Sequence, residues 1–425
     1  MALPRTMRAL ESPIYRRYYV GQAVSMIGTW VQSVALMWLA YDLTHSTAFT
    51  GLIGLLNGVP YLVISPIAGV LGDRLPRRKI LIAVLSLLMI QAIVLTVLTG
   101  LTLIRPWSLA CLALFAGICN AFETPTRQSF FVQLLDRKED LPNAIALNSI
   151  LMNGSRLVGP SLGGLIIAGF GETACFALNA ITYLAVLGAL IRVRVVHKKP
   201  PRAASHPLTD LAEGWRYAMG SLVVRRMLFT LAAVSLAISP YTTLMPAIAV
   251  QTYGKGAELV GLFIGAVGLG AVISAITLAR RTSIRGLGKY IGIAAMVAGV
   301  GAAGFSFSRN VGLSFFFMMM AGFGMFQVGS VINTILQSVI DEDKRSRVMA
   351  YFTMFFIGSA PIGHFSAGWI AEVIGAPRTF LVGGCIALAA GLVFTLLLPS
   401  FRKHLRPLYV RHGIIPASEA GAPTQ

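Results

Sequence analysis

Charged residues are scarce in this sequence. Asp, Glu, Lys and Arg make up 12% of its 425 residues, whereas hydrophobic residues make up 56% and the mean hydropathy is +0.74. A water-soluble globular protein carries about twice that share of charge. A soluble fold of this length could not hide so much apolar surface, because apolar atoms already form about half or more of an ordinary protein's exterior. The composition therefore excludes a soluble globular protein and predicts a chain surrounded by lipid.

Residues for metal or catalytic chemistry are also few. There are four cysteines, each inside an apolar run and without a paired His, which we interpret as small buried hydrophobes: Cys111, Cys119, Cys175 and Cys385. The phosphate-binding pattern Gly-x-x-x-x-Gly-Lys-Ser/Thr is absent, which argues against ATP hydrolysis. No nucleophile with a base and no His-rich or Asp-rich cluster indicates an enzyme. We expect no catalytic residue, no metal and no cofactor.

What the sequence does contain is an excess of positive charge, with 35 Lys and Arg against 16 Asp and Glu and a net charge of +19. The cations gather in short clusters between long uncharged runs. Such clusters set membrane topology and attract anionic lipid headgroups. We therefore expect membrane lipids, and not nucleic acid, as the partner of this charge.

The uncharged runs are long enough to cross a bilayer, which takes about 20 apolar residues. Two contain an internal charge, Glu123 in the fourth and Arg156 in the fifth, and Arg127 lies near the cytoplasmic end of the fourth. The runs predict an all-α integral membrane fold with twelve transmembrane helices. They cover 18–41, 46–72, 80–104, 106–131, 143–168, 173–191, 227–252, 258–279, 289–308, 310–337, 347–371 and 378–399.

The placement of the cations gives the orientation. With the N-terminus in the cytoplasm, 30 Lys and Arg fall in cytoplasmic segments and 4 in the opposite loops, with Arg156 inside a span. Cytoplasmic loops carry the excess of Lys and Arg, so this split supports both the orientation and an even number of spans. The sequence predicts a multi-pass protein of the inner membrane with both termini in the cytoplasm.

An internal repeat divides the chain nearly in half. A shift of 204 residues superposes Gly154, Ser155, Gly159, Gly164 and Gly171 on Gly358, Ser359, Gly363, Gly368 and Gly375. Parallel duplication of six-helix halves places a pseudo-twofold axis along the membrane normal. We expect two pseudo-symmetric six-helix bundles at 1–192 and 227–400, a cytoplasmic linker with an amphipathic helix at 193–226, and a cytoplasmic tail at 401–425.

The turn between the second and third runs contains one acid among its cations. Positive-inside anchoring explains the four cations but not Asp73. An acid there can face a helix N-terminus or a cation on a neighbouring helix, and so hold one bundle against the other. The residues of this turn that carry the pattern are Gly69, Asp73, Arg74, Arg77, Arg78 and Lys79.

This turn resembles the loop 2–3 signature of the major facilitator superfamily, Gly-x-x-x-Asp-Arg-x-Gly-Arg-Arg-Lys. It differs at Pro76, where the signature has Gly. The resemblance implies that Asp73 and Arg74 help to close the cytoplasmic side. It also implies the superfamily's fold, alternating access and a small-molecule substrate.

The fifth run has a second signature, Gly159-Pro160-Ser161-Leu162-Gly163-Gly164. Small residues at this spacing let another helix approach closely, which is also what ordinary helix packing requires. The hexapeptide resembles the Gly-Pro-x-x-Gly-Gly of the superfamily's antiporter motif. The resemblance marks Gly159, Pro160, Gly163 and Gly164 and favours export.

Four further segments narrow the resemblance: 43–47, 121–128, 143–149 and 156–160. They are similar to the branch of the superfamily that contains the enterobactin exporter and related secretion permeases. The likeness runs through nearly the whole chain. It implies export of a small molecule, siderophore-like or lipophilic and drug-like, with protons as the coupling ion.

Ionisable groups at membrane depth are functional candidates because each is costly unless paired or hydrated. By helix rise, Glu123 and Arg156 lie within about 5 Å of the same depth. They could form a structural ion pair, or Glu123 could exchange a proton while Arg156 binds an anionic substrate. Arg127 near the cytoplasmic mouth and His364 in the eleventh run are further candidates, each with a plain packing or anchoring alternative.

Other polar residues could line a central cavity, which the first, fourth, seventh and tenth spans usually form in this superfamily. Hydrogen bonding between helices explains each of them equally well. These cavity candidates are Asn57, Gln91, Tyr241, Gln327 and Asn333.

We therefore predict a monomeric secondary transporter that exports a small molecule. Uptake by the same mechanism is the main alternative, disfavoured by the fifth-run signature. The sequence lacks the clustered catalytic residues that an integral membrane enzyme would need. A channel would need a filter-like repeat or rings of charge, and the sequence shows neither.

Overall fold

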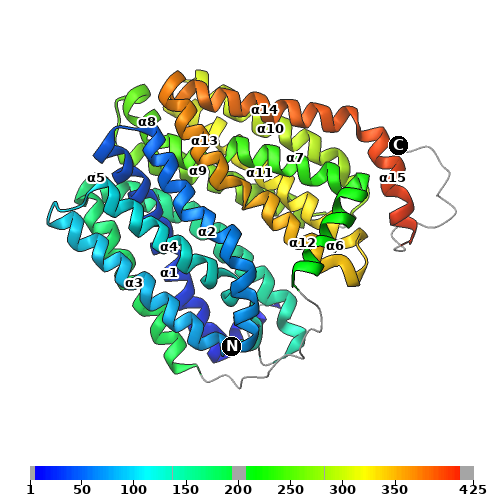
Figure 1. The fold of residues 1–425 in the computed structure, drawn as a ribbon, viewed down its shortest axis with the longest axis horizontal. Coiled ribbons are helices and arrows are strands. Elements are labelled where there is room, and N and C mark those ends of the chain that lie inside the picture. Colours follow the sequence, from blue (N-terminus) through cyan, green and yellow to red (C-terminus); the bar gives the residue numbers. More distant parts are fainter. Residues whose placement is uncertain (1–4, 136, 194–206, 282, 412–425) are drawn as a thin grey trace. The chain divides into compact units, whose positions relative to one another are not determined.

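The protein is helical throughout the part that the structure describes. The computed structural model describes residues 5–135, 137–193, 207–281 and 283–411, and no strand occurs within them (Figure 1). This is the expected result for a chain in lipid, because a helix satisfies its own backbone hydrogen bonds where no water can do so. The predicted all-α membrane fold is confirmed.

The helices follow the predicted apolar runs closely. In the first half they are η1 (Arg5–Glu11), α1 (Pro13–Thr44), α2 (Thr47–Arg74), α3 (Arg77–Gly100), α4 (Pro106–Phe130), η2 (Phe131–Leu134), η3 (Lys138–Asp140) and α5 (Leu141–Arg192). In the second half they are α6 (Pro207–Gly220), α7 (Leu222–Ile238), α8 (Tyr241–Tyr253), α9 (Ala257–Ala279), α10 (Leu287–Phe307), α11 (Val311–Val339), α12 (Glu342–Phe356), α13 (Ser359–Ile374), α14 (Ala376–Leu396) and α15 (Leu398–Arg411).

Eleven continuous stretches in the described residues are long and apolar enough to span a membrane. One of them, α5, has 52 residues and is interrupted at Gly171 by non-helical backbone, with φ 75° and ψ 175°. A helix of that length would extend about 78 Å, more than twice the hydrocarbon thickness. The Cys175 thiol lies 3.7 Å from the Gly163 carbonyl oxygen, so the chain folds back at Gly171. Counted as two spans, α5 brings the total to the expected twelve.

The described residues fall into two compact units, which we treat separately. The first contains residues from 1–201, 241–268 and 364–376, and the second contains residues from 202–240, 269–363 and 377–425. The core of the first unit is formed by α1, α3, α4 and α5, with fully buried side chains such as Tyr15, Leu81, Phe130 and Leu190. The same four helices surround the candidate pocket.

Within the first unit, two helix pairs pack in the same way. A Cβ atom built at Gly164 of α5 would lie 2.5 Å from the Ala257 carbonyl oxygen on α9. A Cβ atom built at Gly368 of α13 would lie 2.5 Å from the Thr47 carbonyl oxygen on α2. Gly164 and Gly368 are the positions that the 204-residue repeat superposes, and Ala257 and Thr47 are themselves 210 residues apart. Both pairs are in contact at their glycines, as small-residue packing requires.

In the second unit, α6 lies against α12. Arg347 Nη1 and Glu213 Oε2 form an ion pair of 2.6 Å, and the Trp215 ring lies 5.5 Å from that of Tyr351. Helix α6 falls in the region where the sequence predicts an amphipathic helix. Glu213 and Trp215 of α6 thus both contact the same neighbouring helix, α12.

Candidate functional site

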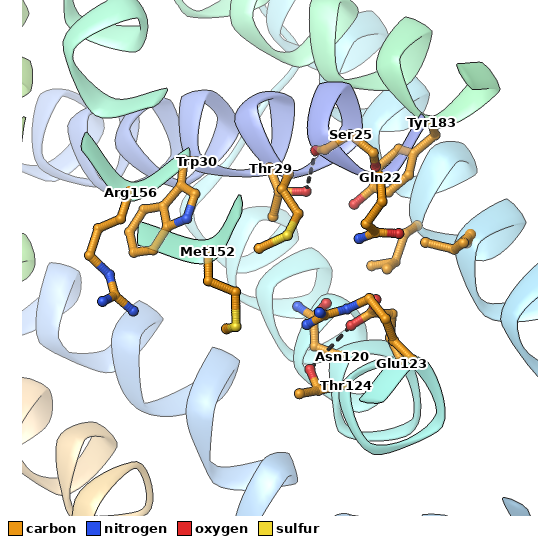
Figure 2. A pocket seen from close by; sticks show the side chains of 14 residues that line it. Gln22, Ser25, Thr29, Trp30, Asn120, Glu123, Thr124, Met152, Arg156 and Tyr183 are labelled. Atoms are coloured by element: carbon orange, nitrogen blue, oxygen red, sulfur yellow. Dashed lines mark hydrogen bonds and ion pairs between the residues drawn. The ribbon is translucent and has the colours of Figure 1, made fainter. Parts of the chain in front are cut away.

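A pocket of about 230 Å³ lies among the helices of the N-terminal half (Figure 2). Its wall comes from α1, α3, α4 and α5. The lining residues are Gln22, Ser25, Met26, Thr29, Trp30, Leu85, Leu88, Asn120, Glu123, Thr124, Arg127, Met152, Arg156 and Tyr183. Three of the four proton or substrate candidates from the sequence, Glu123, Arg127 and Arg156, are therefore brought together at one site.

Helical spacing explains how α1 and α4 contribute to this wall. Gln22, Ser25 and Thr29 are three and four residues apart along α1, so they project from the same helix face. Glu123 and Arg127 are four residues apart on α4 and share a face in the same way. The pocket thus lies between two polar stripes on otherwise apolar helices.

A buried ion pair forms the acidic part of the pocket. Arg127 Nε lies 2.7 Å from Glu123 Oε1, and the two residues are 6% and 8% exposed. The Thr124 hydroxyl donates to the other carboxylate oxygen, Glu123 Oε2, at 3.2 Å. A charge-assisted bond of this length offsets part of the cost of holding both charges away from water. Glu123 is the only acidic residue among those that line the pocket.

The ion pair differs from the pairing that helix depth suggested, which joined Glu123 to Arg156. Depth compares positions along the membrane normal only, whereas contact also depends on the direction in which each side chain leaves its helix. In Figure 2 the Arg156 side chain lies on the opposite side of the pocket from Glu123. Its guanidinium carbon is 5.5 Å from the centre of the Trp30 ring, a cation–π distance.

Two buried polar atoms in the pocket wall have no hydrogen-bond partner in the described structure. They are Nη1 of Arg127 and Oε1 of Gln22. Buried polar groups in native proteins are nearly always satisfied, by protein or by another molecule. One donor and one acceptor are therefore available to water or to a ligand.

The antiporter-like motif packs α5 against two other helices. A Cβ at Gly163 would lie 3.2 Å from the Val31 carbonyl oxygen on α1, and Gly159 contacts the Trp30 side chain. Gly164 and the Pro160 carbonyl face α9 at Gly261. Gly159 and Gly163 therefore pack α5 against α1, which carries the polar stripe of the pocket. Pro160 and Gly164 pack α5 against α9, a helix of the second sequence half.

His364 is outside this pocket. Its Nδ1 lies 2.9 Å from the Thr243 hydroxyl on α8, and its side chain packs on Gly54 of α2. A histidine with one such hydrogen bond and a glycine contact is arranged as a packing residue would be. A proton or substrate role for it stays a prediction.

The cavity candidates make contacts between or within helices. Gln91 accepts a hydrogen bond from Gln32 at 3.1 Å, and Gln327 accepts one from Ser274 at 2.8 Å. Asn333 accepts from Gln337 at 3.1 Å, whereas Tyr241 is 5% exposed and the Asn57 backbone packs on α4. None of the five is among the residues that line the described pocket.

Part of the loop 2–3 signature is described. Arg78 donates to the carbonyl oxygens of Leu190 and Ile191 at 2.7 and 2.8 Å, so it satisfies acceptors at the C-terminus of α5. Arg77 donates to the Ser129 carbonyl at 3.3 Å, and Lys79 is exposed. The side chains of Asp73 and Arg74 and the surroundings of Gly69 lie outside what the structure describes.

Several pocket residues were not predicted from the sequence. Gln22, Ser25 and Thr29 are uncharged, and a search for ionisable groups passes over them. Their i, i+3, i+7 spacing within an apolar run is the signal that would have identified them. Trp30 and Tyr183 could not be separated from lipid-facing or packing aromatics by sequence alone.

Comparison with known proteins agrees with this architecture. The model of a family described as transmembrane secretion effectors, within the major facilitator superfamily, matches residues 5–408. The staphyloferrin A transporter of Staphylococcus aureus is 24% identical over 89% of this chain and 94% of its own length. The enterobactin exporter of Citrobacter koseri is 25% identical over 94% and 95%. The multidrug efflux pump Tap of Mycolicibacterium fortuitum is 25% identical over 88% and 93%.

Solved structures share the fold. A POT family transporter superposes with a TM-score of 0.70 at 12% identity, over 92% of this chain and 98% of its own. A bacterial homologue of the lysosomal transporter Spinster superposes with a TM-score of 0.65 at 14% identity, over 96% and 99%. At these identities the likeness concerns the fold alone.

Proposed function

Because this chain belongs to the transmembrane secretion effector family of the major facilitator superfamily, and is thus a multi-pass membrane transporter and not an enzyme, we propose that it exports a small molecule. Export proceeds by alternating access across the cytoplasmic membrane, in exchange for protons. The relatives named for export of enterobactin and for multidrug efflux support this direction. The substrate is siderophore-like or lipophilic and drug-like.

The observation that carries this proposal is the pocket around the Glu123–Arg127 ion pair. Ionisable groups at membrane depth are costly and are usually retained for function. Glu123, Arg127 and Arg156 together bring one negative and two positive charges to the wall. Leu85, Leu88 and Met152 supply apolar surface beside them. The site therefore suits a molecule with an anionic or hydrogen-bonding group on an apolar body.

Glu123 is the group that we assign to proton exchange. As the only acid in the lining, its carboxylate can accept hydrogen bonds from Arg127 and from hydroxyl or amine groups of a substrate. Protonation removes the negative charge and turns one carboxylate oxygen into an O–H donor, so the group binds these donors less strongly. A proton and a substrate that use the same carboxylate exclude each other, which is the requirement for antiport.

The orientation belongs to the same proposal. With both termini and residues 193–226 in the cytoplasm, the distribution of Lys and Arg follows the positive-inside rule. Two variants test this orientation in intact cells. In each, all four native cysteines are replaced by serine, and one new cysteine is introduced, at position 204 in the first and at position 310 in the second. A membrane-impermeant thiol reagent should label position 310 and leave position 204 unlabelled.

Transport into everted membrane vesicles tests export. The probes are iron-free enterobactin, staphyloferrin A and the lipophilic cation ethidium, each with and without an uncoupler. We expect at least one probe to accumulate in vesicles that contain the protein, and the uncoupler to abolish accumulation. Accumulation only in right-side-out vesicles would indicate uptake and overturn the proposed direction.

Glu123→Gln tests the proton step, and Glu342→Gln is its matched control because Glu342 lies on α12 outside the pocket. We expect Glu123→Gln to lose gradient-driven accumulation while Glu342→Gln retains it. If accumulation by Glu123→Gln kept the pH dependence of the unmodified protein, the coupling role of Glu123 would be wrong.

A further inference from the structure

A second cavity lies on the side of the first unit, between α1 and the end of α5. Its volume is about 570 Å³. It is lined by three arginines, Arg16, Arg17 and Arg192, and by apolar and small residues of both helices. The transport pocket shares none of these residues. We name this cavity the α1–α5 groove.

The sequence pattern of the two helices gives the groove one charged end. Arg16, Val20 and Val24 follow one another at four-residue intervals, so they lie on one face of α1. Leu184, Gly188 and Arg192 have the same spacing on α5, with the arginine last instead of first. Since the groove contains both stripes and its helices cross the bilayer, an antiparallel arrangement brings the arginines to one end and the apolar residues toward the membrane interior.

The walls of the groove are apolar and exposed. Val20, Val24 and Leu184 are 57%, 41% and 56% exposed, which is the exposure expected of side chains in contact with acyl chains. Gly188 has no atom within 4 Å of a built Cβ, whereas Gly21 packs closely on the Ala185 carbonyl. The floor of the groove is thus closed by helix packing, and the missing side chain at Gly188 leaves its space open.

The three arginines select the occupant. All three are exposed, and their guanidinium groups form no ion pair or hydrogen bond in the described part of the chain. By contrast, the nearby Arg78 is bonded to the carbonyls of Leu190 and Ile191. Unpaired guanidinium groups at a membrane interface attract phosphate, and each basic residue contributes to binding of anionic lipid.

From this charge complementarity we propose that the α1–α5 groove is a binding site for one anionic phospholipid. The phosphate of the lipid lies against Arg16, Arg17 and Arg192, and an acyl chain runs along Val20, Val24 and Leu184. By the positive-inside rule this lipid belongs to the cytoplasmic leaflet. A zwitterionic lipid of equal chain length fits the apolar wall but gains less from the arginines.

Native mass spectrometry of the purified full-length protein tests this proposal. Delipidated protein in detergent is mixed with equal amounts of phosphatidylglycerol and phosphatidylcholine that have identical acyl chains. We expect one phosphatidylglycerol to be retained in preference to phosphatidylcholine. Since the readout needs no transport, the result is independent of the proposed export function.

Two variants separate the groove from general surface charge. R16Q/R17Q/R192Q removes the charged end, and we expect affinity for phosphatidylglycerol to fall by about tenfold or more. G188W keeps every charge but fills the groove, and we expect a comparable loss. The matched control R280Q/R402Q/K403Q removes the same number of cations from the second unit and should bind as the unmodified protein does.

Each outcome decides the proposal. Equal loss in the groove and control triple variants would show that only net charge attracts the lipid, and would overturn it. Normal retention by G188W, or no preference for phosphatidylglycerol in the unmodified protein, would overturn it as well. If G188W does not purify as a monodisperse protein, G188L replaces it, and the arginine variant still gives a decision.

Discussion

The Oε2 atom of Glu372 accepts a hydrogen bond from the Thr47 hydroxyl at 3.0 Å, joining the end of α13 to the start of α2. The same atom accepts from the Ser46 hydroxyl and from the Ala48 backbone N–H, each at 3.1 Å. The Thr47 hydroxyl also contacts the Gly368 carbonyl at 3.0 Å. A carboxylate from one sequence half thus satisfies the first turn of a helix from the other half.

We predict that Glu372→Ala lowers the apparent melting temperature of the detergent-purified protein. It removes three hydrogen bonds to a charged acceptor, but the site is exposed, so the expected loss is about 1 kcal/mol. Glu172→Ala is the control, since Glu172 makes none of these contacts, and it should melt as the unmodified protein does. Equal melting temperatures for both variants would contradict a stabilising role of the α2–α13 contact.

The Glu123–Arg127 ion pair predicts a marked difference between single and double variants. Arg127→Gln leaves a buried carboxylate without its cation, at an expected cost of about 3 kcal/mol. Glu123→Gln/Arg127→Gln removes both charges, so its loss of unfolding free energy should be well below the sum of the losses in the two single variants. Thermal unfolding of all four proteins in detergent measures this coupling. Additive losses would show that the pair contributes no interaction energy.

The spans could be predicted from sequence with good accuracy, and the direction of individual side chains could not. Hydropathy locates each run because every residue in lipid is subject to the same solvent constraint. It says little about rotation around the helix axis, and for this reason depth alone allows a Glu123–Arg156 pair and does not indicate the Glu123–Arg127 pair. The reversal at Gly171 was anticipated as a gap between two apolar runs, although the helix there is interrupted by one residue only.

The internal repeat predicts equivalent positions in the two halves, which composition alone cannot do. The superposition of Gly164 on Gly368 came from sequence alone, and in the structure both glycines make a close contact with a carbonyl of another helix. What the repeat could not supply was the partner of each glycine, because Ala257 and Thr47 lie in other spans. Contacts between distant segments depend on packing that no local pattern specifies.

Substitution at these glycines should therefore show the same symmetry. Gly164→Val and Gly368→Val place side-chain atoms against a backbone carbonyl that cannot move aside, so we expect each to lower both the melting temperature and the transport rate. Gly169→Val is the matched control on α5, because a Cβ at Gly169 has no neighbour within 4 Å. If Gly169→Val were as harmful as Gly164→Val, the effect would belong to helix propensity and not to packing.

The backbone at Gly171 gives the last prediction. Its φ of 75° and ψ of 175° lie in a region that only glycine adopts readily, and this conformation ends the first span of α5 so that the second can return. Gly171→Ala should cost about 1–3 kcal/mol, because the new Cβ is strained in the turn whatever space surrounds it. Gly169→Ala, two residues earlier in regular helix, should instead be neutral or stabilising by up to about 1 kcal/mol. Melting temperatures of the two variants in the same detergent measure the difference. Equal stability would mean that the two spans of α5 are joined by backbone that other residues accept.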